Sequence, residues 1–295
     1  MQHAQKQPDE VSALSIEPLD PAENYDLPAS TARVRFLDRK PVRQALPWFV
    51  ILAMFVVWEA IVRLFDIPQF ILPAPTAIFS SLWEWRGPLL ENSWQTLMTT
   101  LVGFALAIVV GVIGGVALGS SAVLYDGFYP AMIGFNSIPK VAVVPILVIW
   151  FGIGTVPAII TAFLIAFFPI MVNVATGIAT VEPELKDVLR ALGASKRQVI
   201  MKVGLPRAMP YFFASLKIAM TVAFVGSIVA ETVAANKGIG HLMLVASSRF
   251  EVPLAFAGLL VTGLMGVGMY LIAETLERRV TGWAMRSTDG VNFAA

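Results

Sequence analysis

Residues 97–118 read LMTTLVGFALAIVVGVIGGVAL, and this run decides the fold of the 295-residue chain. It holds no ionisable side chain, and it is long enough for one helix to cross a hydrocarbon core roughly 30 Å thick. The whole chain is 57% hydrophobic and only 14% charged, whereas a soluble domain carries about 25% charged residues. The sequence therefore predicts an all-α membrane protein.

Outward from this run, five further apolar stretches of similar length bring the expected number of membrane spans to six. The expected spans are Pro47–Leu64, Leu97–Leu118, Tyr129–Phe151, Pro157–Ile178, Tyr211–Ala230 and Pro253–Leu276. They form one transmembrane domain over residues 45–283, with a polar tail at 1–44 before it and a short tail at 284–295 after it. We see neither a second domain nor a clear internal repeat.

The N-terminal tail lacks the basic, apolar and small-residue regions of a signal peptide. Residues 1–30 carry six acidic residues against one lysine, a composition typical of disorder. Basic residues then gather before the first span: Arg33, Arg35, Arg39, Lys40 and Arg43. Such a cluster marks the cytoplasmic side of a membrane.

The remaining Lys and Arg residues predict the orientation of the spans, because cytoplasmic connections carry an excess of basic residues. The connection between the fourth and fifth spans holds Lys186, Arg190, Lys196, Arg197, Lys202 and Arg207. Arg278, Arg279 and Arg286 follow the sixth span, whereas the link at 152–156 has no basic residue. The expected loop at 120–126 has none either, so it gives no information on the orientation. Both termini are therefore expected in the cytoplasm.

The longest polar connection, residues 182–210, reads EPELKDVLRALGASKRQVIMKVGLPRAMP. Four apolar side chains recur at i, i+3, i+4 and i+7, namely Leu185, Val188, Leu189 and Leu192. This spacing places them on one face of a short helix, which Gly193 is expected to end. Lys196–Val203 is expected to form a second short helix that closes at Leu205-Pro206. The pattern predicts a helix–turn–helix that docks a cytoplasmic partner, and the alternative is an amphipathic helix resting on lipid headgroups.

From Gly193 through nine residues to Val203-Gly204-Leu205-Pro206, this connection resembles the cytoplasmic signature of binding-protein-dependent ABC permeases, E-A-A-x3-G-x9-I-x-L-P. Asp187-Val188-Leu189 stands where the signature has Glu-Ala-Ala. Further segments resemble the nitrate/sulfonate/bicarbonate/taurine branch: Leu72-Pro73-Ala74-Pro75, Ile138-Pro139-Lys140-Val141-Ala142, Trp150-Phe151-Gly152-Ile153-Gly154, and Glu231 before Gly238-Ile239-Gly240. The resemblance covers about residues 45–283.

This resemblance implies a six-helix permease of the type I ABC importer kind in a bacterial inner membrane. Two permease copies, expected as a homodimer, would form the path, and a solute-binding protein would deliver the solute from outside. Two ATPase subunits would bind ATP and Mg²⁺, since this chain has no G-x4-G-K-[ST] loop. The residues expected to couple the permease to the ATPase are Asp187, Leu189, Leu192, Gly193, Ala194, Leu205 and Pro206. No catalytic residue, resident cofactor or nucleic-acid partner is expected in this chain.

Polar groups within the expected spans indicate the translocation path, because a charge at bilayer depth costs about 2.5–3.5 kcal/mol on insertion scales. The pathway candidates are Asn136, Pro139, Lys140, Asn173 and Glu231. Pro139 and Pro145 are expected to kink the third span. Lys140 either lines the path or has a structural role, snorkelling or pairing with a carboxylate. Glu231 is either a hydrogen-bond hub or a solute contact.

Two other features complete the expectations. Gly111, Gly115 and Gly119 form a small-xxx-small ridge, which we expect to pack within the chain. His3 and His241 are isolated and cysteine is absent, so no metal site is expected.

The resemblance favours a small organic or inorganic anion as the solute, such as a sulfonate, nitrate or a carboxylate, and Lys140 would attract it. The same machine could instead carry a thiamine-precursor or riboflavin-like heterocycle. A secondary transporter is a further alternative, although such proteins usually show repeated halves with discontinuous helices. An intramembrane enzyme would need a nucleophile–base pair or a cluster of metal ligands, which the spans lack.

Overall fold

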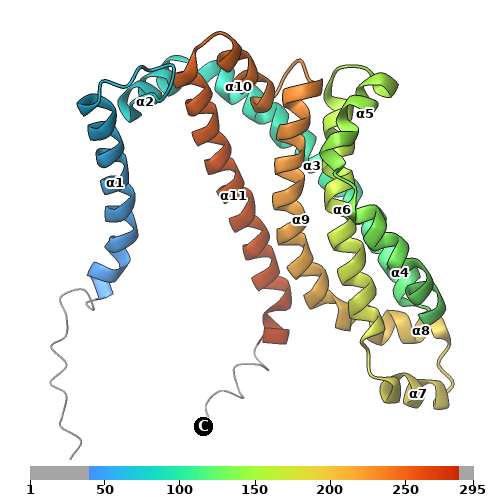
Figure 1. Cartoon of the computed structure of the whole chain (residues 1–295). Coiled ribbons are helices and arrows are strands. Elements are labelled where there is room, and N and C mark those ends of the chain that lie inside the picture. The colour runs from blue at the N-terminus through green and yellow to red at the C-terminus, as the bar shows by residue number, and fades with distance from the viewer. Residues whose placement is uncertain (1–39, 286–295) are drawn as a thin grey trace, which may run out of the picture. The chain divides into compact units, whose positions relative to one another are not determined.

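A computed structural model describes residues 40–285, so most of the expected N-terminal tail and residues 286–295 lie outside the described residues. Every regular element in the described range is a helix (Figure 1). The α-helices are α1 (Lys40–Leu64), α2 (Pro75–Glu84), α3 (Arg86–Gly119), α4 (Ala122–Ser137), α5 (Val144–Phe151), α6 (Thr155–Ala179), α7 (Pro183–Ala191), α8 (Lys196–Val199), α9 (Leu205–Ala234), α10 (Ile239–Ser248) and α11 (Val252–Met285). A 3₁₀ helix, η2 (Lys140–Val143), precedes α5, and a π-helix, η3 (Ile200–Gly204), joins α8 to α9.

The chain divides into two units, residues 1–54 and 55–295. The first unit contributes the beginning of α1. The second unit contains every candidate site residue.

Five helical segments are long and apolar enough to cross a membrane: Leu46–Leu64, Arg86–Gly119, Thr155–Ala179, Lys196–Ala234 and Val252–Val280. A sixth crossing is in two pieces, Val123–Ser137 and Lys140–Phe151, which are bent by 73° at the break between them. The all-helical membrane fold that the sequence predicts is confirmed, with six spans if the bent pair counts as one.

The third expected span differs from the structure in two ways. The residues expected to form a loop at 120–126 belong largely to α4, and only Ser120 and Ser121 separate α4 from α3. The break itself lies at Ile138-Pro139, where Ile138 is extended, with φ −69° and ψ 126°. The ring of a proline disfavours the helical conformation in the residue before it, so the helix stops instead of kinking.

Pro145 does not kink a helix, which corrects our expectation. It lies in the first turn of α5, where a backbone N–H would have no partner within the helix. The two prolines therefore act together: Pro139 follows the end of α4, and Pro145 favours the start of α5.

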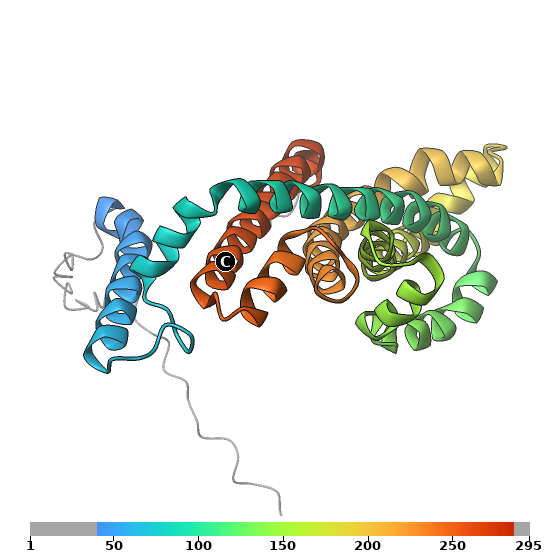
Figure 2. The same ribbon diagram turned by 90° about the horizontal axis from the view of Figure 1, so that it is seen from above.

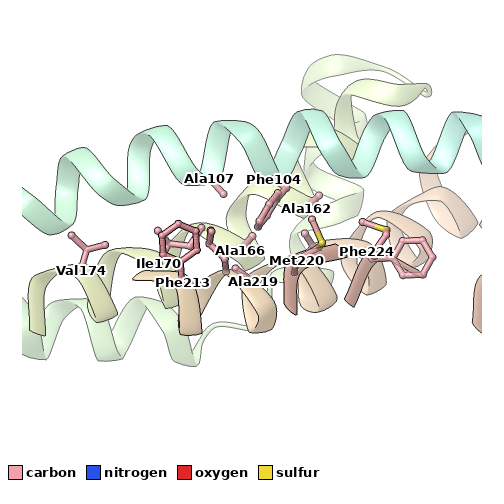
Figure 3. Packing of buried hydrophobic residues seen from close by; sticks show 14 of the residues in the cluster. Phe104, Ala107, Ala162, Ala166, Ile170, Val174, Phe213, Ala219, Met220 and Phe224 are labelled. Carbon is pink, nitrogen blue, oxygen red and sulfur yellow. The ribbon is translucent and has the colours of Figure 1, made fainter. Parts of the chain in front are cut away.

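The centre of the second unit is formed by α3, α6 and α9 (Figure 2). Alanines and other small side chains fill the space between these helices, and Ala107, Ala162, Ala166 and Ala219 are fully buried there (Figure 3). Small side chains allow helix backbones to approach closely, which is the usual basis of helix association in a membrane.

The glycine ridge of α3 packs on α6, as expected for a contact within the chain. A Cβ atom placed on Gly115 would lie 2.7 Å from the carbonyl oxygen of Met171, and one on Gly119 would lie 2.7 Å from that of Ala175. Real side chains do not tolerate such distances. The two backbones are therefore in direct contact along the ridge.

The helix ends of this unit gather on two opposite sides (Figure 1). On one side, the junction of α3 and α4, the end of α6 and the α7–α8 segment line a common cavity. On the other, Gly154 N–H donates to the carbonyl oxygen of Ala234 at 2.7 Å, and Lys237 pairs with Glu91 at 2.9 Å. The connection rich in Lys and Arg lies on the first side.

Candidate functional site

The α7 helix presents apolar side chains that the rest of the described chain does not cover. Val188 is 57% exposed and Leu192 is 78% exposed, although both lie on the apolar stripe that the sequence predicts. On the polar side, Arg190 forms an exposed ion pair with Asp187 at 3.2 Å. An apolar stripe bordered by charges is typical of a surface that packs against another protein or a membrane.

The turn after α7 is built by backbone hydrogen bonds that require Gly193. Gly193 has φ +83°, donates to the carbonyl oxygen of Arg190 at 2.9 Å, and is followed by Ala194, which donates to Leu189 at 3.0 Å. This pair of bonds is the Schellman arrangement, in which glycine takes the left-handed conformation at no steric cost. No atom lies within 4 Å of a Cβ placed on Gly193, so the constraint is conformational.

The next helix begins with a capping box. Gln198 N–H donates to the Oγ of Ser195 at 3.3 Å, and Ser195 N–H donates to the side-chain oxygen of Gln198 at 2.8 Å. These two bonds satisfy donors that a helix start otherwise leaves open. The structure thus has two helices joined by a tightly bonded turn, as the sequence predicts.

Leu205-Pro206 does not close the second helix, which corrects our expectation. α8 continues through η3 into α9, so that Lys196–Ala234 forms one helical span of 39 residues. Because Pro206 has no N–H, the ordinary helical bond to the carbonyl of residue 202 is impossible. The π-helical turn at Ile200–Gly204 changes the hydrogen-bond register just before the proline, and the helix continues.

The α7–α8 segment is anchored to the membrane helices at two points. Val199 and Gly204 are buried, and a Cβ on Gly204 would lie 3.6 Å from the side chain of Ile178 at the end of α6. An ion pair at 3.1 Å joins Arg207 in α9 to Glu182 just before α7. The segment is therefore attached to α6 and is continuous with α9.

Three of the pathway candidates lie together at the broken span. Lys140 follows the break at Pro139, and its Nζ donates to the backbone oxygen of Asn136 and, at 2.7 Å, to Asn136 Oδ1. The ammonium group therefore caps the C-terminal end of α4, where the helix dipole favours a positive charge. Within residues 40–285, Lys140 forms no ion pair with a carboxylate.

Asn173, the fourth candidate, forms no hydrogen bond with this cluster among the described residues. It is partly buried in α6, and its Nδ2 donates to the carbonyl oxygen of Pro169, one turn earlier, at 2.8 Å. In the described part of the chain, no hydrogen bond joins Asn173 to Asn136 or Lys140.

Glu231, the fifth candidate, lies at the other side of the unit and has the contacts of a hydrogen-bond hub. Its side chain is buried, with 1% exposure. The carboxylate accepts from Thr96 Oγ1 at 2.7 Å, from Thr99 Oγ1 at 3.2 Å and from Gly240 N–H at 3.2 Å. These bonds join α9, α3 and the beginning of α10 through one side chain.

Gly238 explains why glycine is needed beside this hub. It has φ +117°, and a Cβ atom on it would lie 2.5 Å from Glu231 Oε2. Gly238 N–H also donates to Asn92 Oδ1 at 2.8 Å. The chain can pass the carboxylate only where it has no side chain.

One intramembrane ion pair was not assigned from the sequence. Lys217 in α9 pairs with Glu277 in α11 at 2.6 Å, and the two side chains are 27% and 13% exposed. A lysine in an apolar span usually pairs with a carboxylate or a backbone carbonyl, or faces a water-filled cavity, so the sequence indicates a polar partner without identifying it. Glu277 lies one residue beyond the expected end of the sixth span, which concealed it. Among the described residues, no group of three His, Cys, Asp or Glu residues gathers as metal ligands would.

Comparison with known proteins gives consistent results. The family described as "Binding-protein-dependent transport system inner membrane component" matches residues 107–282. The chain is 32% identical to the riboflavin transport system permease protein RibX of Chloroflexus aurantiacus, over 79% of this chain and 88% of that one. It is 29% identical to the taurine transport system permease protein TauC of Escherichia coli, over 78% of this chain and 86% of that one.

The fold also resembles a solved structure. A chain of the MetNI methionine ABC transporter, in an inward-facing conformation, superposes with a TM-score of 0.59 at 21% identity, over 67% of this chain and 98% of that one. At this level of identity the likeness concerns the fold.

Proposed function

This chain belongs to the family of binding-protein-dependent transport system inner membrane components, and we propose that it is the permease subunit that forms the translocation path of an ATP-driven importer for a small solute. The observation that carries this proposal is the α7–α8 segment. It exposes an apolar stripe at Val188 and Leu192 and is continuous with the membrane helix α9. Such a segment can receive force from a partner and pass it directly into a membrane helix.

The partner that fits the stripe is an ATPase subunit. Two such subunits would bind ATP and Mg²⁺ and would close on each other, and each would carry one α7 helix with it as a rigid body. In this proposal the coupling residues are Asp187, Leu189, Leu192, Gly193, Ala194, Leu205 and Pro206. The permease itself would be non-catalytic and would work as a homodimer that receives solute from a binding protein.

The orientation follows from the charge distribution. Six basic residues belong to the connection that contains α7 and α8, and basic connections face the cytoplasm. On the opposite side, Lys237 is paired with Glu91. We therefore propose that the α7–α8 side faces the cytoplasm of a bacterial inner membrane, that both termini lie there, and that the side with α10 receives the binding protein.

The broken span is the best candidate for the wall of the path. Lys140 places a positive charge directly after the break at Pro139, within an apolar span. No carboxylate among the described residues forms an ion pair with its ammonium group. A small anion such as a sulfonate, nitrate or a carboxylate suits this charge. The relative TauC, named for taurine, supports this solute class.

A heterocyclic solute is the second candidate, and one observation favours it. RibX, a relative named for riboflavin, is 32% identical to this chain. In that case Lys140 would keep its role as the cap of α4 without contacting the solute. A thiamine-precursor pyrimidine belongs to the same class.

Reconstitution tests the function and the solute class together. The chain is incorporated into liposomes with the ATPase and binding protein encoded nearest to its gene, and uptake of taurine, nitrate and riboflavin is measured with and without ATP inside. ATP-dependent uptake of nitrate, or of taurine through its sulfonate group, is the expected result. Uptake of riboflavin alone would transfer the proposal to the second solute class, and ATP-independent uptake of every compound would contradict the importer assignment.

A further inference from the structure

A cavity of about 360 Å³ lies between the α7–α8 segment and the adjacent ends of the membrane helices. Its lining comes from the α3–α4 junction, the end of α6, and the segment from α7 to η3. The apolar part of the lining includes Ile178, Val181, Val199 and Ile200. Neither the coupling contacts nor the translocation path described above accounts for this cavity.

The polar lining is mainly basic. Lys186, Arg190 and Lys196 contribute three positive charges, whereas Asp126 contributes one negative charge. Ser120 and Tyr125 also line the cavity. The Ser120 hydroxyl donates to the carbonyl oxygen of Val116, and the Tyr125 hydroxyl lies 3.3 Å from Thr176 Oγ1. The cavity is therefore equipped to hold an anion.

Nearby carboxylates do not fully neutralise these three basic side chains. Among the described residues, the ammonium group of Lys196 has neither an ion pair nor a hydrogen bond. Lys186 reaches only the carbonyl oxygen of Ala179, at 3.5 Å, and Arg190 shares an exposed ion pair with Asp187 at 3.2 Å. Excess positive charge thus remains at the cavity, and a bound anion would lower its electrostatic free energy.

We propose that this cavity binds a phosphate group, and specifically the headgroup of an anionic phospholipid of the adjacent leaflet. Three basic side chains beside hydroxyl groups are the chemistry that recognises a phosphate. The position, at the ends of membrane helices, is the depth at which headgroups lie, and basic pockets between helices on the cytoplasmic side bind such headgroups. The orientation rests on the function proposed above.

The size and the mixed lining favour a lipid over a free phosphate ion. The volume is in the range of sites that take organic ligands, about 300–1,000 Å³, and exceeds what a single ion needs. The four apolar side chains in the lining provide contacts for the glycerol and the first acyl carbons. The carboxylate of Asp126 can accept hydrogen bonds from the hydroxyl groups of a phosphatidylglycerol headgroup.

Lipid retention by the purified full-length chain tests this site. The protein is reconstituted from a neutral detergent into vesicles of phosphatidylcholine alone, or of equal parts phosphatidylcholine and phosphatidylglycerol, and bound lipid is counted by native mass spectrometry. The variants are Lys196→Ala and Lys186→Ala. Lys202→Ala is the matched control, because Lys202 belongs to the same segment and is exposed, but does not line the cavity.

The expected result is preferential retention of phosphatidylglycerol that weakens about tenfold in each cavity variant and is unchanged in the control. Displacement by inorganic phosphate, with the same dependence on Lys196, would support the site with free phosphate as its source. Equal loss in Lys202→Ala, or equal retention of both lipids by the unmodified chain, would overturn the proposal. The measurement needs no transport. A chain that retains the lipid but imports nothing would therefore support the lipid site and contradict only the proposed function.

Discussion

Glu231 accepts a hydrogen bond from Thr96 Oγ1 at 2.7 Å, although the two residues are 135 positions apart in the sequence. The same hydroxyl oxygen accepts from the N–H of Ile239 at 2.8 Å. One buried carboxylate and one threonine therefore hold α3, α9 and the first turn of α10 together on the side proposed to receive the binding protein.

Removal of this carboxylate should destabilise the protein. Glu231→Ala leaves Gly240 N–H without its acceptor, at about 1–3 kcal/mol for such a buried group. The Thr96 and Thr99 hydroxyls keep only carbonyl oxygens of α3 as acceptors, among them those of Asn92 and Gln95, so the bonds between the helices are lost. We expect a clearly lower melting temperature in detergent and a smaller loss for Glu231→Gln, which keeps one acceptor oxygen. The control is Glu91→Ala, since exposed ion pairs contribute only about 0–1 kcal/mol. Equal melting temperatures for Glu231→Ala and the control would refute the hub.

The turn at Gly193 should be essential for coupling but not for insertion. Any L-residue at φ +83° is strained by about 1–2 kcal/mol, and the aspartate in Gly193→Asp adds a charge beside the docking stripe. We expect this variant, and charge reversal in Asp187→Lys, to lose most solute uptake and ATPase stimulation at normal membrane levels. Gly127→Ala is the control, because Gly127 lies within α4 and no atom is within 4 Å of its Cβ position. Normal uptake by the first two variants would rule out α7 as the coupling helix.

The proposed topology can be checked with tags in right-side-out vesicles. A tag at the N-terminus and one at Ser195 should be protected from an impermeant label, because both positions are proposed to face the cytoplasm. A tag at Asn236 should react, since it lies on the opposite side. Labelling of the Ser195 tag from outside would contradict the orientation and the six-span arrangement.

Lys140 should affect uptake more than stability. If its ammonium contacts an anionic solute, Lys140→Ala should lower uptake about tenfold, the size of one hydrogen bond to a charged group, and Lys140→Glu should lower it further. Basal ATPase activity should stay unchanged, and the melting temperature should fall only slightly, because a charge at a helix end is worth about 0.3–1 kcal/mol. Arg249→Ala removes one exposed positive charge elsewhere and serves as control. A lower melting temperature with unchanged uptake would leave Lys140 only its role as the cap of α4.

The ion pair of Lys217 and Glu277 should be visible in a double-mutant cycle. Lys217→Met or Glu277→Gln alone removes one half of the ion pair. Such a change costs about 3–5 kcal/mol when the pair is fully buried, and less here, where both side chains are partly exposed. The double variant should melt at a higher temperature than either single variant. Additive losses would show that the two side chains do not stabilise α9 against α11 as a pair.

Local patterns predicted the parts of the structure that depend on few residues. The apolar run at 97–118 is enough to place a span. The apolar side chains at i, i+3, i+4 and i+7 before Gly193 are enough to place α7 and its turn. In both cases the interactions that determine the structure lie within one helix or one turn. Hydropathy and glycine spacing report such interactions directly.

The features that the sequence did not predict depend on backbone register or on distant partners. A proline within an apolar run is compatible with a kink, a break or a helix start, and only the conformation of Ile138 and the position of Pro145 distinguish these outcomes. The continuation of α8 into α9 depends on a π-helical turn, which has no sequence signature of its own. The partners of Glu231 and Lys217 lie on other helices, and no local pattern identifies them.

The direct backbone contact between α3 and α6 makes these two helices a rigid pair within the second unit. At Gly115 and Gly119, α3 has no side chain, and its backbone lies directly against the backbone of α6 and against Val174 and Ile178. Movement of one helix along the other would bring these atoms into collision. We therefore expect α3 and α6 to move as one body. We expect movement relative to this pair in the other elements, above all in the broken span of α4 and α5. The break at Pro139 is the position at which these two pieces can change their angle.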